Sequence, residues 1–82
     1  MQLNGNKPAT LGDLRRGEEA VISGLSLPDG VNQRLMELGF LPGAHVRAGR
    51  SAPGGDPLVF DVDGSQVALR RETAVHIAVN RQ

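Results

Sequence analysis

Six hydroxyl side chains and two histidines are the groups in this sequence that could take part in nucleophilic or acid–base chemistry. The hydroxyls are those of Thr10, Ser23, Ser26, Ser51, Ser65 and Thr73. A nucleophile needs a neighbouring base that a third group orients, and the chain has no cysteine to supply a thiolate. The segment 49–53, Gly-Arg-Ser-Ala-Pro, lacks the second glycine of a nucleophile elbow. We therefore expect no enzymatic active site.

The two histidines, His45 and His76, are the candidate metal ligands. Both fall on the outward side of predicted strands that lie far apart in the sequence, whereas a protein metal site needs three or four convergent ligands. Asp61 and Asp63 lie at a predicted turn, where we expect their carboxylates to be solvated. We expect no metal centre and no cofactor within one chain, although His45 with a carboxylate could hold a divalent metal weakly or through a second chain.

Composition disfavours binding of phosphates and nucleic acids. No glycine-rich phosphate loop is present. Nine Lys and Arg residues balance nine Asp and Glu residues, so the formal charge is zero, whereas a nucleic-acid backbone attracts a net basic surface. The only aromatic residues, Phe40 and Phe60, fall at predicted core positions. No ring is then left to stack on a base or to line a proline-peptide groove.

The length of the chain limits its organisation. With 82 residues it forms one small domain. Residues 1–9 are polar and without period, so we predict a loose lead-in to a domain over residues 10–82. The first residues contain no apolar signal core, and no segment approaches the ~20 apolar residues of a membrane span. We expect a soluble cytoplasmic protein.

Alternating apolar positions and frequent turn residues predict a mainly β domain. The predicted strands cover residues 19–24, 44–52, 57–62, 65–69 and 75–80. A capped helical turn is predicted at residues 10–14 and a short turn at 70–73. Five amphipathic strands, with one short helix inserted after the first, favour a small closed barrel, because closure leaves no unpaired sheet edge.

The dipeptide Asp63-Gly64 is the strongest hairpin signal, because it suits a two-residue turn between strands. A turn there sets the register of the flanking strands. The resulting pairs are Val62–Ser65, Asp61–Gln66, Phe60–Val67, Val59–Ala68 and Leu58–Leu69. The apolar pairs 58–69 and 60–67 share one face, and a slip by one residue would mix the apolar and polar sets.

Residues 31–38 predict a helix of about two turns, with Val31, Leu35 and Leu38 on the face toward the core. Gly39 suits the left-handed residue that ends a helix, and Phe40 can then contact Leu35. A helix this short is unstable alone in water. We therefore expect it to pack on the barrel.

Met36 lies off this apolar stripe, about 140° from Val31 around the helix axis. In one interpretation Leu25, Leu27 or Pro28 folds over it. In the other, Met36 is an exposed apolar contact for a partner protein, framed by Gln33, Arg34 and Glu37.

Five stretches, taken in order, carry a resemblance to a known family. They read Thr-Leu-Gly-Asp-Leu at 10–14, Gln-Arg-Leu-Met-Glu-Leu-Gly-Phe at 33–40, Pro-Gly-Ala at 42–44, Ala-Pro-Gly-Gly-Asp-Pro-Leu at 52–58 and Val-Ala-Leu-Arg at 67–70. Gly17, Ala74 and Val79 also match. Each stretch consists of turn and core residues, but their order and spacing closely resemble the ferrous iron transport protein A (FeoA) family over residues 10–79.

The resemblance implies an SH3-like β-barrel with a helix inserted after the first strand. It also implies a non-enzymatic cytosolic accessory of a FeoB-type membrane transporter of ferrous iron, whose cytoplasmic part carries a GTPase domain. The family is often associated with transition-metal binding, but this sequence shows no convergent ligand set, so we assign no metal ligands. Arg34 and Glu37 match the family's helix motif, and Gln33 stands where members often have the first of two arginines. Together with Met36, these are the candidate partner-binding residues.

The alternative function comes from a second resemblance. A similar SH3-like domain occurs at the C-terminus of iron-dependent transcriptional repressors of the DtxR type, where it serves regulation. This sequence shows no helix-turn-helix ahead of the barrel, so we expect it not to act as such a repressor by itself. A stand-alone regulatory domain is the alternative.

Overall fold

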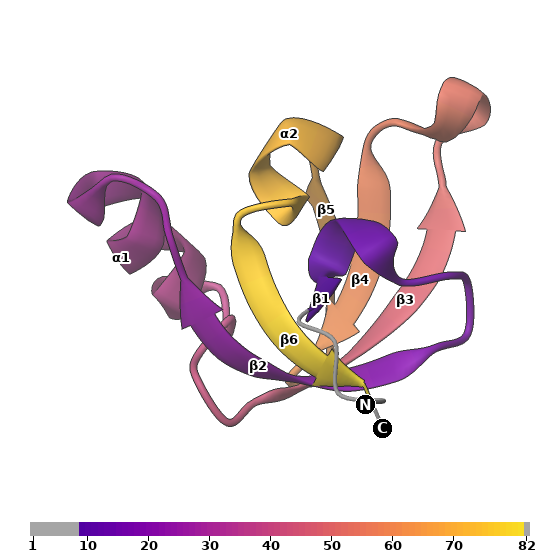
Figure 1. The fold of residues 1–82 in the computed structure, drawn as a ribbon. Helices are drawn as coiled ribbons and strands as arrows, with labels where there is room; N and C mark the ends of the chain where they lie inside the picture. The colour runs from indigo at the N-terminus through magenta and orange to yellow at the C-terminus, as the bar shows by residue number, and fades with distance from the viewer. Residues whose placement is uncertain (1–8, 82) are drawn as a thin grey trace, which may run out of the picture.

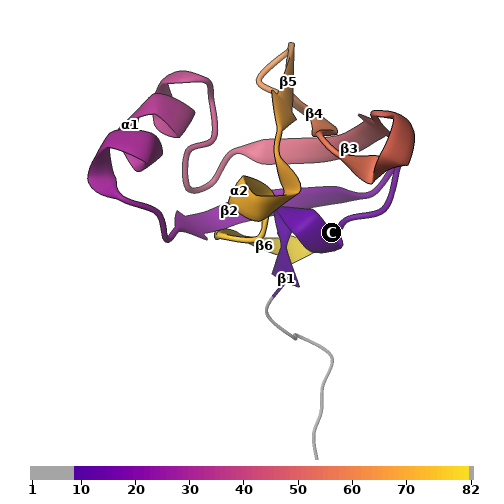
Figure 2. The same cartoon turned by 90° about the horizontal axis from the view of Figure 1, so that it is seen from above.

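The computed structural model describes residues 9–81, which form one curved antiparallel sheet flanked by short helices (Figures 1 and 2). The strands are β1 (Ala9–Thr10), β2 (Glu19–Leu25), β3 (His45–Ser51), β4 (Leu58–Val62), β5 (Ser65–Leu69) and β6 (Ile77–Arg81). The helices are α1 (Asp29–Glu37) and α2 (Arg71–Ala74), and the 3-10 turns are η1 (Leu11–Asp13) and η2 (Pro53–Gly55). Residues 1–8 of the predicted lead-in lie outside the described residues, and Ala9 opens β1.

The predicted mainly β, SH3-like architecture is confirmed, but the sheet is open. Its strand order is β1-β6-β2-β3-β4-β5, and within residues 9–81 no pairing joins β1 to β5. The prediction of five strands in a closed barrel therefore needs correction, because β1 adds a sixth strand and two residues are too few to complete the ring. Leu11 of η1 and Ala74 of α2, both fully buried, pack beside β1 and β6 and complete the core there.

The β4–β5 hairpin has the predicted register, pair for pair. Asp63 and Gly64 have φ angles of 50° and 78°, and both positions of a type I′ turn require positive φ. Leu58, Phe60 and Val62 of β4 are buried as a result, while the residues between them face outward.

Phe40 and Phe60 are fully buried, which confirms the core positions predicted for both. The other strands supply inward side chains at every second position. These are Ala20 and Ile22 of β2, Val46 and Ala48 of β3, and Ile77 and Val79 of β6. The predicted alternation is therefore correct along β2 up to Ile22 and along β3 up to Ala48, and His45 and Arg47 are exposed as expected.

Helix α1 lies beside the barrel and buries less of itself than predicted (Figures 1 and 2). Leu35 is 4% exposed, but Val31 and Leu38 are 40% and 45% exposed. The prediction that all three side chains face the core is wrong for the outer two, because a helix at the margin of a small barrel contacts it along a narrow line.

The C-terminal end of α1 is tied to the core by main-chain hydrogen bonds. The Gly39 N–H donates to the Met36 carbonyl and the Phe40 N–H donates to the Leu35 carbonyl, both at 3.0 Å. With Gly39 at a φ of 111°, this is a Schellman motif. Leu35 and Phe40 belong to the same buried cluster, in agreement with the predicted contact.

The predicted turn at 70–73 is a single helical turn, α2, and the last strand therefore starts at Ile77. Val75, predicted to lie on that strand, is 44% exposed at the end of α2. The Arg71 N–H donates to Asp56 Oδ1 at 2.9 Å, and Arg71 Nη2 donates to the Gly55 carbonyl at 3.0 Å. These bonds hold α2 against the turn that contains η2.

Replacing the central phenylalanine tests the core. Phe60→Ala leaves a cavity between β3 and β5, and we expect it to lower the free energy of unfolding by ~3–5 kcal/mol. Val75→Ala, a truncation at an exposed position, should change it by less than ~0.5 kcal/mol. Urea unfolding followed by circular dichroism measures both, and equal midpoints for Phe60→Ala and the parent would contradict this core.

Two glycines of the α1 region give a paired test of helix geometry. Gly39→Ala places a Cβ at positive φ and 3.4 Å from the Asp63 Cβ, so we expect a loss of ~1–2 kcal/mol. Gly30→Ala lies within the helix with open space around its Cβ, and should stabilise by up to ~1 kcal/mol. The same unfolding assay compares them; stabilisation by Gly39→Ala would contradict the helix ending described above.

Candidate interaction surface

Both ends of α1 are hydrogen-bonded to the barrel, which sets how the helix is presented. Before the helix, the Ser26 N–H donates to the His76 carbonyl at 2.9 Å. After it, the Gly43 N–H donates to the Ile22 carbonyl at 2.7 Å. The segments that flank the helix are thus held at the turn before β6 and at β2, and its outward side faces solvent.

We call the outward side of the helix the α1 surface; it consists of Val31, Gln33, Arg34, Met36, Glu37 and Leu38. The four candidate partner-binding residues from the sequence lie within it, and all are exposed. Met36 is 37% exposed, so part of its side chain is accessible to solvent.

The polar residues of the α1 surface line a shallow hollow of about 440 Å³. Gln33, Arg34 and Glu37 form its walls with Gly30 and Leu38. One turn of helix separates Gln33 from Glu37, so an amide, a guanidinium and a carboxylate are presented together. Met36 lies around the helix from this hollow, which divides the four candidates between a polar side and an apolar edge.

Three exposed apolar residues near α1 were not identified as surface residues by the sequence. Val31 and Leu38 were assigned to the core, and Leu41, 48% exposed, received no assignment. Leu41 lines a second hollow, of about 380 Å³, with His45 and Asp63. Its position between Phe40 and Pro42 carries no periodic signal that would have marked it as exposed.

The candidate metal ligands are not brought together. His45 begins β3 and His76 precedes β6, and both are exposed. Among residues 9–81, no three His, Asp or Glu side chains gather closely enough to hold a metal ion. His45 and Asp63 share the hollow beside Leu41. They are two possible ligands, fewer than the three or four that a protein metal site needs.

None of the helices described in residues 9–81 has the length and apolar character needed to cross a membrane.

Comparison with known proteins identifies the family. The FeoA domain model matches residues 9–81. A relative from Porphyromonas gingivalis is 33% identical over 69 residues and is described as an Fe(2+) transport protein A/Fe(2+) transporter FeoB fusion protein. The match covers 84% of this chain but only 8% of that relative. Through this relative the family is connected with Fe(2+) transport.

Solved structures agree with the fold. The FeoA protein of Chlorobium tepidum superposes with a TM-score of 0.84 at 33% identity, covering 88% of this chain and 69% of that one. The FeoA of Stenotrophomonas maltophilia, described as an SH3 domain protein and solved with zinc, gives a TM-score of 0.75 at 35% identity, covering 85% and 87%.

A manganese-dependent transcriptional repressor superposes on 92% of this chain, and the match covers 41% of the repressor, with a TM-score of 0.81. Its identity is 17%, so this likeness concerns the fold alone and lends the alternative function no support beyond architecture. The family model, by contrast, spans almost all of the described residues, and two FeoA structures of at least 33% identity share the fold. This chain therefore belongs to the FeoA family.

Proposed function

We propose that this chain is a non-enzymatic accessory protein of ferrous iron uptake, which acts in the cytoplasm by docking on the GTPase-bearing part of a FeoB-type transporter. The observation that carries the proposal is the fusion relative, in which a FeoA portion and a FeoB transporter share one polypeptide. A covalent link keeps two modules at a high effective concentration. Where the two modules are not fused, a binding surface has to provide the same proximity.

The α1 surface supports the proposal as the docking site. Val31, Met36 and Leu38 are each more than a third exposed. Leu38 lines the hollow with Arg34, and Met36 forms the apolar edge on the other side of the helix. Methionine and arginine are enriched at protein interfaces, and arginine is among the residues that most often dominate binding energy. Because α1 is hydrogen-bonded to the barrel at both ends, these side chains are presented on a positioned helix, which lowers the cost of ordering them on binding.

A role as an accessory requires binding but no reacting group. The proposed effect is on the transporter, whose transport or GTP hydrolysis would respond to the docked domain. In this respect the α1 hollow, with its amide, guanidinium and carboxylate, supplies hydrogen bonds that orient the partner.

Co-purification tests the proposal directly. We expect the tagged chain, co-expressed with the FeoB-type transporter of the same genome, to retain that transporter from detergent-solubilised membranes. A second membrane protein of similar abundance serves as the control. Failure to retain the transporter in the nucleotide-free, GDP-bound and GTP-analogue-bound states would remove the proposed function.

A single substitution tests the docking site. Met36→Glu places a charge at an exposed position, so we expect the free energy of unfolding to change by less than ~1 kcal/mol. If Met36 is an anchor, retention of the transporter should fall about tenfold or more. Val75→Glu, an equivalent change at a residue exposed outside α1, is the matched control. Full retention by a folded Met36→Glu variant would exclude Met36 from the docking site.

A further inference from the structure

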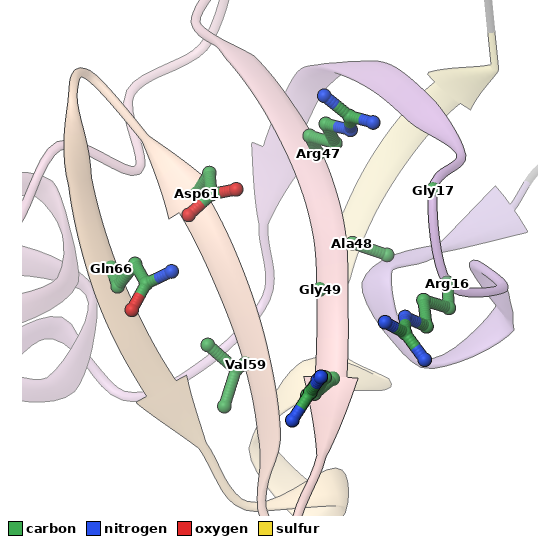
Figure 3. Close-up of a pocket in the computed structure, with 9 residues that line it drawn as sticks. Arg16, Gly17, Arg47, Ala48, Gly49, Val59, Asp61 and Gln66 are labelled. Atoms are coloured by element: carbon green, nitrogen blue, oxygen red, sulfur yellow. The ribbon is translucent and has the colours of Figure 1, made fainter.

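A third hollow, of about 450 Å³, lies on the outer face of the sheet (Figure 3). It extends from the loop before β2 across β3 and β4 to β5. We call it the arginine groove; the residues that matter are Arg16, Arg47, Gly49, Arg50, Asp61 and Gln66. It shares no residue with the α1 surface.

Main-chain bonds hold the loop that carries Arg16 against β3. The Gly17 N–H donates to the Ala48 carbonyl at 2.8 Å, and the Ala48 N–H donates to the Glu18 carbonyl at 2.9 Å. Gly17 has a φ of 89°, a conformation that glycine adopts without strain. Figure 3 shows the Arg16 side chain extending from this loop toward β3, so its position is set by the backbone.

An irregularity in β3 brings Arg50 into the same groove. In a regular strand Arg47 and Arg50 would point to opposite faces. The register between β3 and β4 shifts between Ala48 and Ser51, and such a bulge re-aims the side chains that follow it. Arg50 is consequently exposed and lines the groove together with Arg47.

Gly49 leaves the floor of the groove bare between these arginines. A Cβ at this position would lie 3.3 Å from the Val59 carbonyl oxygen, closer than ordinary van der Waals contact. Glycine therefore keeps the backbone of β3 accessible where the groove crosses it.

The arginines that line the groove outnumber its carboxylates. Arg47 has Glu19 and Asp61 as its register partners on the strands to either side. The Glu18 carboxylate accepts the Arg15 N–H at 2.6 Å and lies 3.9 Å from Arg81 Nε. Of the residues that line the groove, only Asp61 is acidic. With three arginines and one carboxylate, the groove is thus a locally basic patch on a chain whose formal charge is zero.

We propose that the arginine groove binds an acidic segment of a protein partner, with Asp or Glu carboxylates on Arg16 and Arg50. Guanidinium groups bind carboxylates through paired hydrogen bonds. The groove is shallow and spans three strands, which suits an extended chain. Both phenylalanines are buried, so neither can stack on a base, and a neutral chain attracts nucleic acid poorly. This site goes beyond the proposed function and does not depend on it.

Titration of ¹⁵N-labelled protein with hexaglutamate in low-salt buffer tests the site. We expect amide shifts centred on Gly17, Gly49 and Arg50, and an affinity that falls as salt is added. The double variant Arg16→Gln/Arg50→Gln should weaken binding by roughly fivefold to tenfold. The spectrum itself reports that each variant is folded.

Controls separate this site from general charge effects. Arg70→Gln/Arg71→Gln removes the same charge outside both the groove and the α1 surface and should leave the hexaglutamate affinity within about twofold. Hexalysine should cause no shifts at the groove. The proposal would be overturned by absent or scattered shifts, by equal weakening in both double variants, or by hexathymidylate binding the groove more tightly than hexaglutamate does.

Discussion

Burial of one face of a short, curved sheet around Phe40 and Phe60 is the constraint on which the rest of this domain depends. An 82-residue chain buries a modest share of its surface, which limits its stability. Because the chain has no cysteine, no disulfide adds to that stability. Nearly every inward position of β2, β3, β4 and β6 is therefore apolar. The polar and charged groups are left to the outer face, the loops and α1, and that is where binding has to take place.

Two surfaces meet this condition in different ways. The α1 surface is formed by a helix that contacts the barrel mainly through Leu35, so most of its circumference remains accessible. The arginine groove is formed by the sheet itself, where a bulge after Ala48 and the missing side chain of Gly49 interrupt the regular outer face. The groove lies where the regular ladder is interrupted, whereas the α1 surface lies on a regular helix that buries little of its circumference.

Much of the fold could be predicted because independent signals agreed. At Asp63-Gly64 the turn chemistry and the alternation of Leu58 and Phe60 require the same register, and the structure has it. The exposure of α1 could not be predicted in the same way. A helical wheel shows which residues share a side, but not how closely the helix approaches the barrel, so Val31 and Leu38 were wrongly assigned to the core.

The open sheet and the arginine groove could not be predicted from the sequence, for related reasons. A strand of two residues, Ala9–Thr10, is too short to show a period, so it was not predicted. With only five strands predicted, a closed barrel was the arrangement that left no unpaired edge. Alternation also fails at a bulge: a regular strand would place Arg50 on the inner face of β3, whereas it is exposed. The exposure of Gln33, Arg34 and Glu37 was predictable, since they lie off the apolar stripe. Leu41 was not, because nothing around it repeats.

Because α1 ends in a Schellman motif, Phe40 has two structural roles. Phe40 fills the core, and its N–H closes the last turn of the helix on Leu35. Any repacking around that ring therefore tilts the helix axis as well as loosening the interior. In a family of such domains, substitutions in the core would therefore change the direction of α1 without changing any exposed residue of the helix. A partner that binds α1 would have to adapt to core side chains that it never contacts.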